Sequence, residues 1–121
     1  MGGIVPGMRM PEPTYFILTA LTDQPLHGYG IMLAIRSLSG GRLDLRPGTL
    51  YAALDRLTEQ GLLSIDREEA AGSRLRRYYK LTDPGTAALA NEVEQLRANA
   101  SLAAGRLRRR AAVRPASAGG L

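Results

Sequence analysis

The chain has 121 residues, which is enough for one domain with a modest core and an appendage. Its 16 basic and 11 acidic residues leave a net charge of +5, which favours an anionic partner such as nucleic acid. It has no cysteine, which excludes disulfides, thiolate metal sites and cysteine nucleophiles. No apolar run approaches the roughly 20 residues of a membrane span, and the first residues lack the apolar region of a signal peptide, so we expect a cytoplasmic protein without membrane contact.

The N-terminal part is expected to form a loose arm and then a buried helix. Residues 1–11 are rich in glycine, methionine and proline and show no periodicity, which indicates a flexible arm. The almost wholly apolar run after Thr14 predicts a buried helix that the threonine hydroxyl caps. Pro25, within the turn at residues 22–26, prevents this helix from continuing.

A second helix is predicted over Gly28–Leu38. Its apolar face is expected to consist of every third or fourth residue, namely Tyr29, Met32, Ile35 and Leu38. His27, directly before it, is expected to cap the helix or to face a phosphate, and Ser39-Gly40-Gly41 ends it. Residues 42–45 alternate polar and apolar side chains, which predicts a short extended segment.

A third helix between Pro47 and Gly61 is the strongest candidate for reading DNA. Leu50, Leu54 and Leu57 recur at steps of four and three and predict one buried stripe. The rest of its surface carries short or hydrogen-bonding groups that suit a DNA major groove and its phosphates. The predicted DNA-binding residues are Arg46, Thr49, Tyr51, Ala52 and Arg56.

Two structural roles compete with DNA contact on this helix. The ring of Tyr51 can pack on the neighbouring helix instead of meeting DNA. Arg56 can pair with Glu59, which follows three residues later on the same face.

After Gly61 the apolar residues recur at every second position. This alternation predicts a β-hairpin with strands over residues 63–66 and 74–81 and a tip at residues 68–73. Four basic residues crowd its second strand, and strand alternation places Arg77 toward the core. The wing candidates for DNA contact are therefore Arg74, Arg76 and Lys80. The alternative is a solvated face neutralised by Asp66, Glu68 and Glu69, and a shift in register would reverse the alternation.

A fourth helix is predicted over residues 83–110, with Thr82 or Asp83 as its cap and Pro84 in its first turn. Apolar residues follow a seven-residue repeat, which is typical of a seam against another helix and favours a homodimer. The predicted dimerisation residues are Leu89, Val93, Leu96, Ala100, Ala103 and Leu107. Residues 111–121 lose this periodicity and are expected to be disordered.

Three helices followed by a hairpin are typical of a winged helix-turn-helix domain, here over residues 12–82, so the fold class is mainly α with a small β-hairpin. Three segments, PLHGYGI, LRPGTLYAALDRLTEQGLL and RRYYKLTDPG, resemble the signature segments of the PadR family of bacterial transcriptional regulators. The resemblance covers about residues 14–110. It implies a short-form member with a single C-terminal dimerisation helix that represses transcription until a small molecule releases it.

Two functions therefore follow from the sequence. The first is a dimeric repressor that binds double-stranded DNA at an inverted repeat, with half-sites about one helical turn apart, and an effector near Tyr15 and Phe16. The second is a winged-helix module that binds protein and has no specific DNA site. The lone His27 cannot build a metal cluster and has no nucleophile beside it, so we expect no enzyme, no metal and no cofactor.

Overall fold

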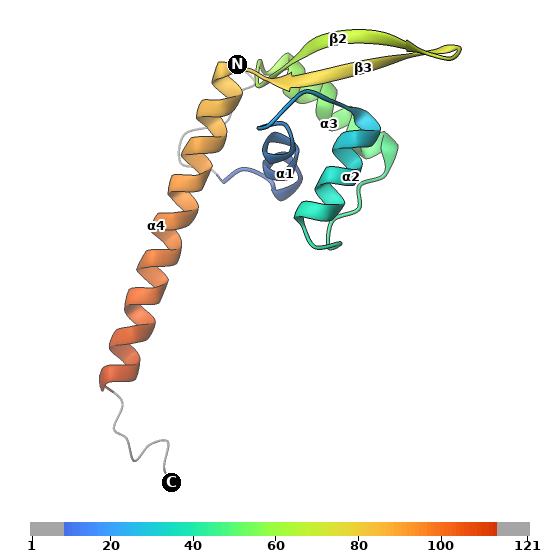
Figure 1. Ribbon diagram of the computed structural model, residues 1–121. Helices are drawn as coiled ribbons and strands as arrows, with labels where there is room; N and C mark the ends of the chain where they lie inside the picture. Colours follow the sequence, from blue (N-terminus) through green and yellow to red (C-terminus); the bar gives the residue numbers. More distant parts are fainter. Residues whose placement is uncertain (1–8, 114–121) are drawn as a thin grey trace. The chain divides into compact units, whose positions relative to one another are not determined.

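The computed structural model describes residues 9–113, which form four helices and a three-stranded antiparallel sheet (Figure 1). In chain order the elements are α1 (Glu12–Ala20), β1 (Leu26–His27), α2 (Gly28–Leu38), α3 (Pro47–Glu59), β2 (Leu63–Ala71), β3 (Arg74–Leu81) and α4 (Asp83–Val113). This order confirms the predicted fold class, a winged helix-turn-helix followed by a long C-terminal helix.

The core joins the first three helices to the base of the sheet. Each of the three helices contributes at least two side chains that are 2% exposed or less, namely Ile17, Leu18, Ile31, Ile35, Leu50, Leu54 and Leu57. Leu63 and Tyr79 add the inner face of β2 and β3. Burial of each large aliphatic side chain stabilises the fold by about 1.5–3 kcal/mol, so this cluster supplies the main driving force.

The first helix begins earlier than the sequence predicts. Thr14 was predicted as its cap, but it lies inside α1 and is buried, while Pro11 precedes the helix and its carbonyl accepts the Tyr15 N–H at 3.0 Å. Met10 is buried in the core, so the described end of the predicted arm is anchored by apolar packing. Residues 1–8 lie outside the described part.

The buried face of α2 also differs from the prediction. The side of α2 that meets the core carries Gly28, Ile31 and Ile35, whereas Tyr29 is 60% exposed. The two faces share Ile35, and Met32 packs against the core as predicted, so the buried face is rotated by only part of the roughly 100° that separates successive residues. The predicted cap is confirmed, since Nδ1 of His27 accepts the N–H of Gly30 at 3.2 Å.

Residues 42–45 belong to no strand of the sheet, but their side chains alternate as predicted: Leu43 and Leu45 pack against the core, whereas Arg42 and Asp44 are exposed. The hydroxyl of Ser39 accepts the Leu43 N–H at 2.9 Å, which satisfies locally a backbone donor that a strand would pair with a neighbour.

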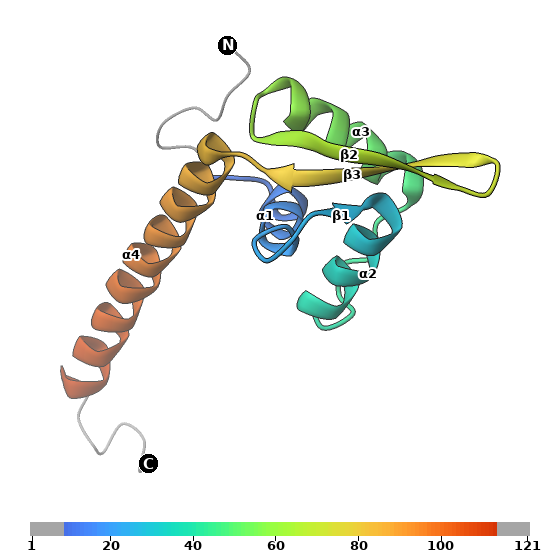
Figure 2. The ribbon, with the colours of Figure 1, turned by 45° about the horizontal axis from the view of Figure 1, so that its top comes forward.

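β3 lies between β1 and β2 in the sheet (Figure 2). β2 and β3 continue to Ala71 and Arg74, so the predicted tip at residues 68–73 is wrong, and only Gly72 and Ser73 form the turn. β1, which sequence periodicity did not reveal, pairs Leu26 with Tyr79 and His27 with Tyr78.

The end of α3 and the start of α4 are held together by backbone and cap contacts. Gly61 has φ +79°, a conformation that favours glycine after a helix, and Leu62 N–H donates to the Leu57 carbonyl at 3.0 Å. Thr82 caps α4 by accepting the Gly85 N–H at 3.0 Å, and its hydroxyl donates to the Gly61 carbonyl at 2.6 Å.

Two compact units divide the chain after Ala90. Leu89, a predicted dimerisation residue, packs in the core of the first unit and leaves little of its surface exposed. In the second unit Val93 and Leu96 are partly exposed, and Ala100, Ala103 and Leu107 are exposed. α4 continues to Val113, three residues into the predicted tail, and residues 114–121 lie outside the described part. Among residues 9–113, no helix combines the length and the apolar content that crossing a membrane requires.

Candidate nucleic-acid interface

One face of α3 is buried and the opposite face is open to solvent. Leu50, Leu54 and Leu57 fill the core, which leaves the other side of the helix for a partner. All the predicted DNA-binding residues of this segment are exposed: Arg46, Thr49, Tyr51, Ala52 and Arg56. Arg56 forms no ion pair with Glu59 or with any other described residue, so its charge is available to a ligand.

Tyr51 lies at the flank of α3, between the buried stripe and the open face. Its side chain is 45% exposed, and its ring lies directly against Gly28 at the start of α2. Tyr51 therefore packs on the neighbouring helix, as the alternative interpretation allows, and is also exposed to solvent. The tyrosine has an anchored ring and a solvent-accessible edge.

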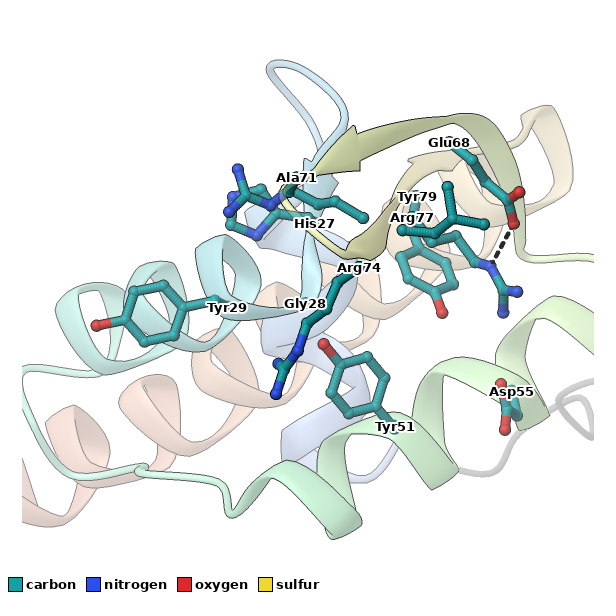
Figure 3. A pocket seen from close by; sticks show the side chains of 12 residues that line it. His27, Gly28, Tyr29, Tyr51, Asp55, Glu68, Ala71, Arg74, Arg77 and Tyr79 are labelled. Atoms are coloured by element: carbon teal, nitrogen blue, oxygen red, sulfur yellow. Dashed lines mark hydrogen bonds and ion pairs between the residues drawn. The ribbon is translucent and has the colours of Figure 1, made fainter.

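An open cleft of about 580 Å³ separates the start of α2, the flank of α3 and the wing formed by β2 and β3. Tyr29 and Gly28 line it from α2, and Tyr51 and Asp55 line it from α3 (Figure 3). The wing lines it from residues 74–77 of β3, which include three arginines. The cleft therefore brings the predicted recognition helix and the predicted wing to one site.

The wing arginines fall into paired and unpaired groups. Arg77 donates to Glu68 at 3.0 Å across the hairpin, and Lys80 lies 3.8 Å from Asp66. Arg74 and Arg76 have no ion pair with another described residue. The neutralised strand face that the sequence offered as an alternative thus accounts for Arg77 and Lys80 through close pairs. Arg76 lies opposite Glu69 in the register and interacts with it only through longer-range charge, and Arg74 has no such acidic partner among the described residues.

Two of these positions differ from the sequence expectation. Arg77 shares the α3-facing side of β3 with Tyr79, as alternation predicts, yet it is exposed because the hairpin extends beyond the core. Lys80 was predicted to contact DNA together with Arg74 and Arg76, but it does not line the cleft. Among the predicted wing contacts, the cleft brings together Arg74 and Arg76 only.

The face of the wing that carries Tyr78 has its own ion pairs. Arg67 pairs with Asp66 and with Glu69, each at 2.8 Å, and its guanidinium lies 3.9 Å from the Tyr78 ring centroid. The hydrogen bond from Arg67 lowers the pKa of the Glu69 carboxyl, so this acid is ionised at neutral pH. These exposed pairs contribute little stability individually, but they cancel the charge of Arg67 locally.

His27 connects α2 to the wing. Its ring meets the edge of Tyr78 with centroids 5.3 Å apart. Burial, and to a smaller extent the positive charge of Arg76, lowers the pKa of the imidazole. The ring is therefore neutral at pH 7, which lets Nδ1 accept the Gly30 N–H. Within the described residues no group of acidic or histidine side chains is placed to bind a metal ion.

Tyr15 and Phe16, the predicted effector residues, lie elsewhere in the fold. Both are partly buried against the core, and their rings meet edge to face with centroids 5.3 Å apart. Arg42 lies 6.0 Å from the Phe16 centroid and pairs with Glu12 at 2.7 Å. Neither aromatic residue lines the cleft.

Sequence reasoning missed several residues that line the cleft, and three of them bear on the site. Tyr29 was placed on the buried face of α2, Arg77 was expected to point inward, and Gly28 received no role of its own. The isoleucines at positions 31 and 35 were a usable signal, because a stripe through them excludes Tyr29. The contact between Gly28 and Tyr51 has no sequence signal, since 23 positions separate the two residues.

Comparison with known proteins relates the chain to transcriptional regulators. The model of the transcriptional regulator PadR-like family matches residues 17–91, more than half of the chain. The transcriptional regulator YqjI of Escherichia coli is 35% identical over 80 residues, which cover 66% of this chain and 37% of that protein. The transcriptional regulator Rv3488 of Mycobacterium tuberculosis is 36% identical over 76 residues, which cover 63% of this chain and 67% of that protein.

A solved structure similar to the chain contains DNA. The crystal structure of Bacillus subtilis PadR in complex with operator DNA matches with a TM-score of 0.63 and 26% identity. The match covers 71% of this chain and 48% of that chain. This chain therefore spans less than half the length of both YqjI and the B. subtilis protein.

Proposed function

Because this chain belongs to the PadR-like family of transcriptional regulators, we propose that it represses transcription as a dimer that binds DNA through α3 and the wing. The observation that carries this proposal is the cleft, in which Tyr51 of α3 and the unpaired Arg74 and Arg76 of the wing face one space. The similarity to B. subtilis PadR, which was solved with operator DNA, supports it.

Each predicted residue has a distinct task in this proposal. Thr49, Ala52 and Arg56 occupy the open face of α3 and meet base edges in the major groove. Arg46, at the start of the helix, adds its charge to the positive end of the helix dipole and binds phosphate. Arg74 and Arg76 extend these contacts to the neighbouring backbone or minor groove.

The dimer would form through the second unit. The exposed seam of α4 runs from Val93 through Leu96, Ala100 and Ala103 to Leu107, and an apolar stripe of this kind is stabilised when a second copy covers it. Two copies of α3 would then enter major grooves about 34 Å apart on an inverted repeat. A small molecule near Tyr15 and Phe16 would release DNA by favouring a different spacing of the two copies. This regulator would act in the cytoplasm and catalyse no reaction.

The dependence of binding on salt tests the proposed function. A dimer that neutralises roughly six to ten phosphates loses about three to five decades of affinity between about 50 and 200 mM salt. Fluorescence anisotropy with a labelled random-sequence duplex, followed by selection of tight binders from a random pool, measures this dependence and the operator. Absence of binding at low salt would contradict the proposal and favour a protein-interaction module.

Arg76→Ala should weaken duplex binding more than Lys80→Ala. Arg76 is unpaired and lines the cleft, whereas Lys80 lies beside Asp66 outside it. Loss of one phosphate contact reduces the slope of log affinity against log salt by about 0.9. Anisotropy titrations at four salt concentrations compare the two variants, which lose the same charge. Equal slopes would remove Arg76 from the interface.

A further inference from the structure

Gly28 is in close contact with the Tyr51 ring. It is buried at the first position of α2, and the ring lies against it on the side where a side chain would begin (Figure 3). A Cβ at this position would overlap the Tyr51 hydroxyl oxygen, lie 2.5 Å from Cζ and lie 2.8 Å from Cε1. Separations below about 3.0 Å are not compatible with two packed carbon atoms, so any side chain here would displace the ring.

The backbone does not require glycine at this position. Gly28 is helical and is not among the residues with positive φ, so alanine would adopt the same backbone without strain. The close approach of Tyr51 is the structural reason for the missing side chain. The atoms that would collide belong to the far end of a flexible side chain, so the ring would rotate away while the helix keeps its place.

The geometry points to Gly28 as a positioning residue that seats the Tyr51 ring at the junction of α2, α3 and the wing, and thereby fixes the place from which this tyrosine contacts DNA. This inference rests on the proposed function. With the ring seated, Tyr51 is held beside the cleft that Arg74 and Arg76 line. A free tyrosine would lose rotamer entropy on binding, and prior seating removes that cost.

Gly30 provides a matched control two positions along the same helix. A Cβ at Gly30 would make ordinary contacts of 3.6 Å with Leu26 and 3.7 Å with His27, and would not reach Tyr51. Both substitutions replace a helical glycine with alanine, so their effects on helix propensity are similar. They differ in whether the Tyr51 ring is displaced.

The test uses the full chain and a duplex that the wild-type protein selects from a random pool. Gly28→Ala should weaken binding about tenfold, as Tyr51→Ala does, because each loses roughly one hydrogen bond to DNA. Gly30→Ala should stay within about twofold of the wild type, and melting temperatures should change by less than about 5 °C. In a Tyr51→Ala background, Gly28→Ala should have no further effect, since no ring is left to displace.

Several results would overturn the inference. Equal duplex affinity of Gly28→Ala and the wild type would do so. A further loss of duplex affinity when Gly28→Ala is added to Tyr51→Ala would also do so. If Gly28→Ala does not fold, Tyr51→Ala and Tyr51→Phe decide the question, because wild-type binding by both would leave no contact to position. Failure of the wild-type protein to bind any duplex would instead contradict the proposed function.

Discussion

Leu107→Glu should convert the protein to a monomer and lower its affinity for the selected duplex by about two orders of magnitude or more. Leu107 is 66% exposed on the seam of α4, where a second copy would bury it. A carboxylate at that position would have to be desolvated without a partner in the dimer. Because a dimer holds its second recognition helix at a high effective concentration, loss of the dimer costs about 10²–10⁴ in affinity.

Leu102→Glu is the matched control for this prediction. Leu102 is 62% exposed on the same helix, but its place in the seven-residue repeat lies off the seam. Both variants add the same negative charge, so the difference between them isolates the seam. Sedimentation equilibrium gives the oligomeric state and anisotropy gives the affinity. A Leu107→Glu protein that keeps the mass of a dimer would place the dimer interface elsewhere.

Gly85→Ala should destabilise the winged-helix unit by about 3 kcal/mol, the upper part of the range for overpacking. A Cβ at Gly85 would overlap the Leu62 carbonyl oxygen and lie 3.0 Å from the Leu62 carbonyl carbon. That carbonyl cannot move freely, because it accepts the Thr82 N–H at 3.2 Å and the Leu62 N–H is bonded to Leu57. The first turn of α4 would therefore have to separate from the end of α3.

Urea unfolding followed by circular dichroism measures this loss, and Gly48→Ala serves as the control. Apart from its two chain neighbours and the backbone of its own helix, no described atom lies within 4 Å of a Cβ at Gly48, so alanine there should be neutral or stabilise by up to about 1 kcal/mol. An unchanged midpoint for Gly85→Ala would mean that the first turn of α4 is not packed on Leu62.

Local sequence patterns predicted the helices that have a regular apolar stripe or a clear capping signal. Leu50, Leu54 and Leu57 defined α3, since a stripe at steps of four and three has a single helical solution. The start of α4 was equally clear, because a capping residue followed by proline in the first turn is a local signal, although only the structure decided for Thr82 over Asp83 as the cap. The error in α2 had a local cause, since its many apolar residues allowed two overlapping faces that share Ile35.

Long-range contacts decided what local patterns left open. β1 has two residues, too few to show alternation, and it exists because β3 offers it a free edge. The pairing of Arg77 with Glu68 and of Lys80 with Asp66 depends on the register of β2 against β3, including a bulge between Ile65 and Arg67. Composition alone could not separate these cations from the unpaired Arg74 and Arg76.

The sequence by itself determined the order of helices and hairpin, the face of α3 that is buried and the membership of the PadR-like family. These properties follow from spacing and capping within short segments, where each residue acts through near neighbours. Only the tertiary structure decided that Tyr51 lies against Gly28 and shares a cleft with Arg74 and Arg76. Such contacts depend on how three separate elements pack around one core, a geometry that no local period encodes.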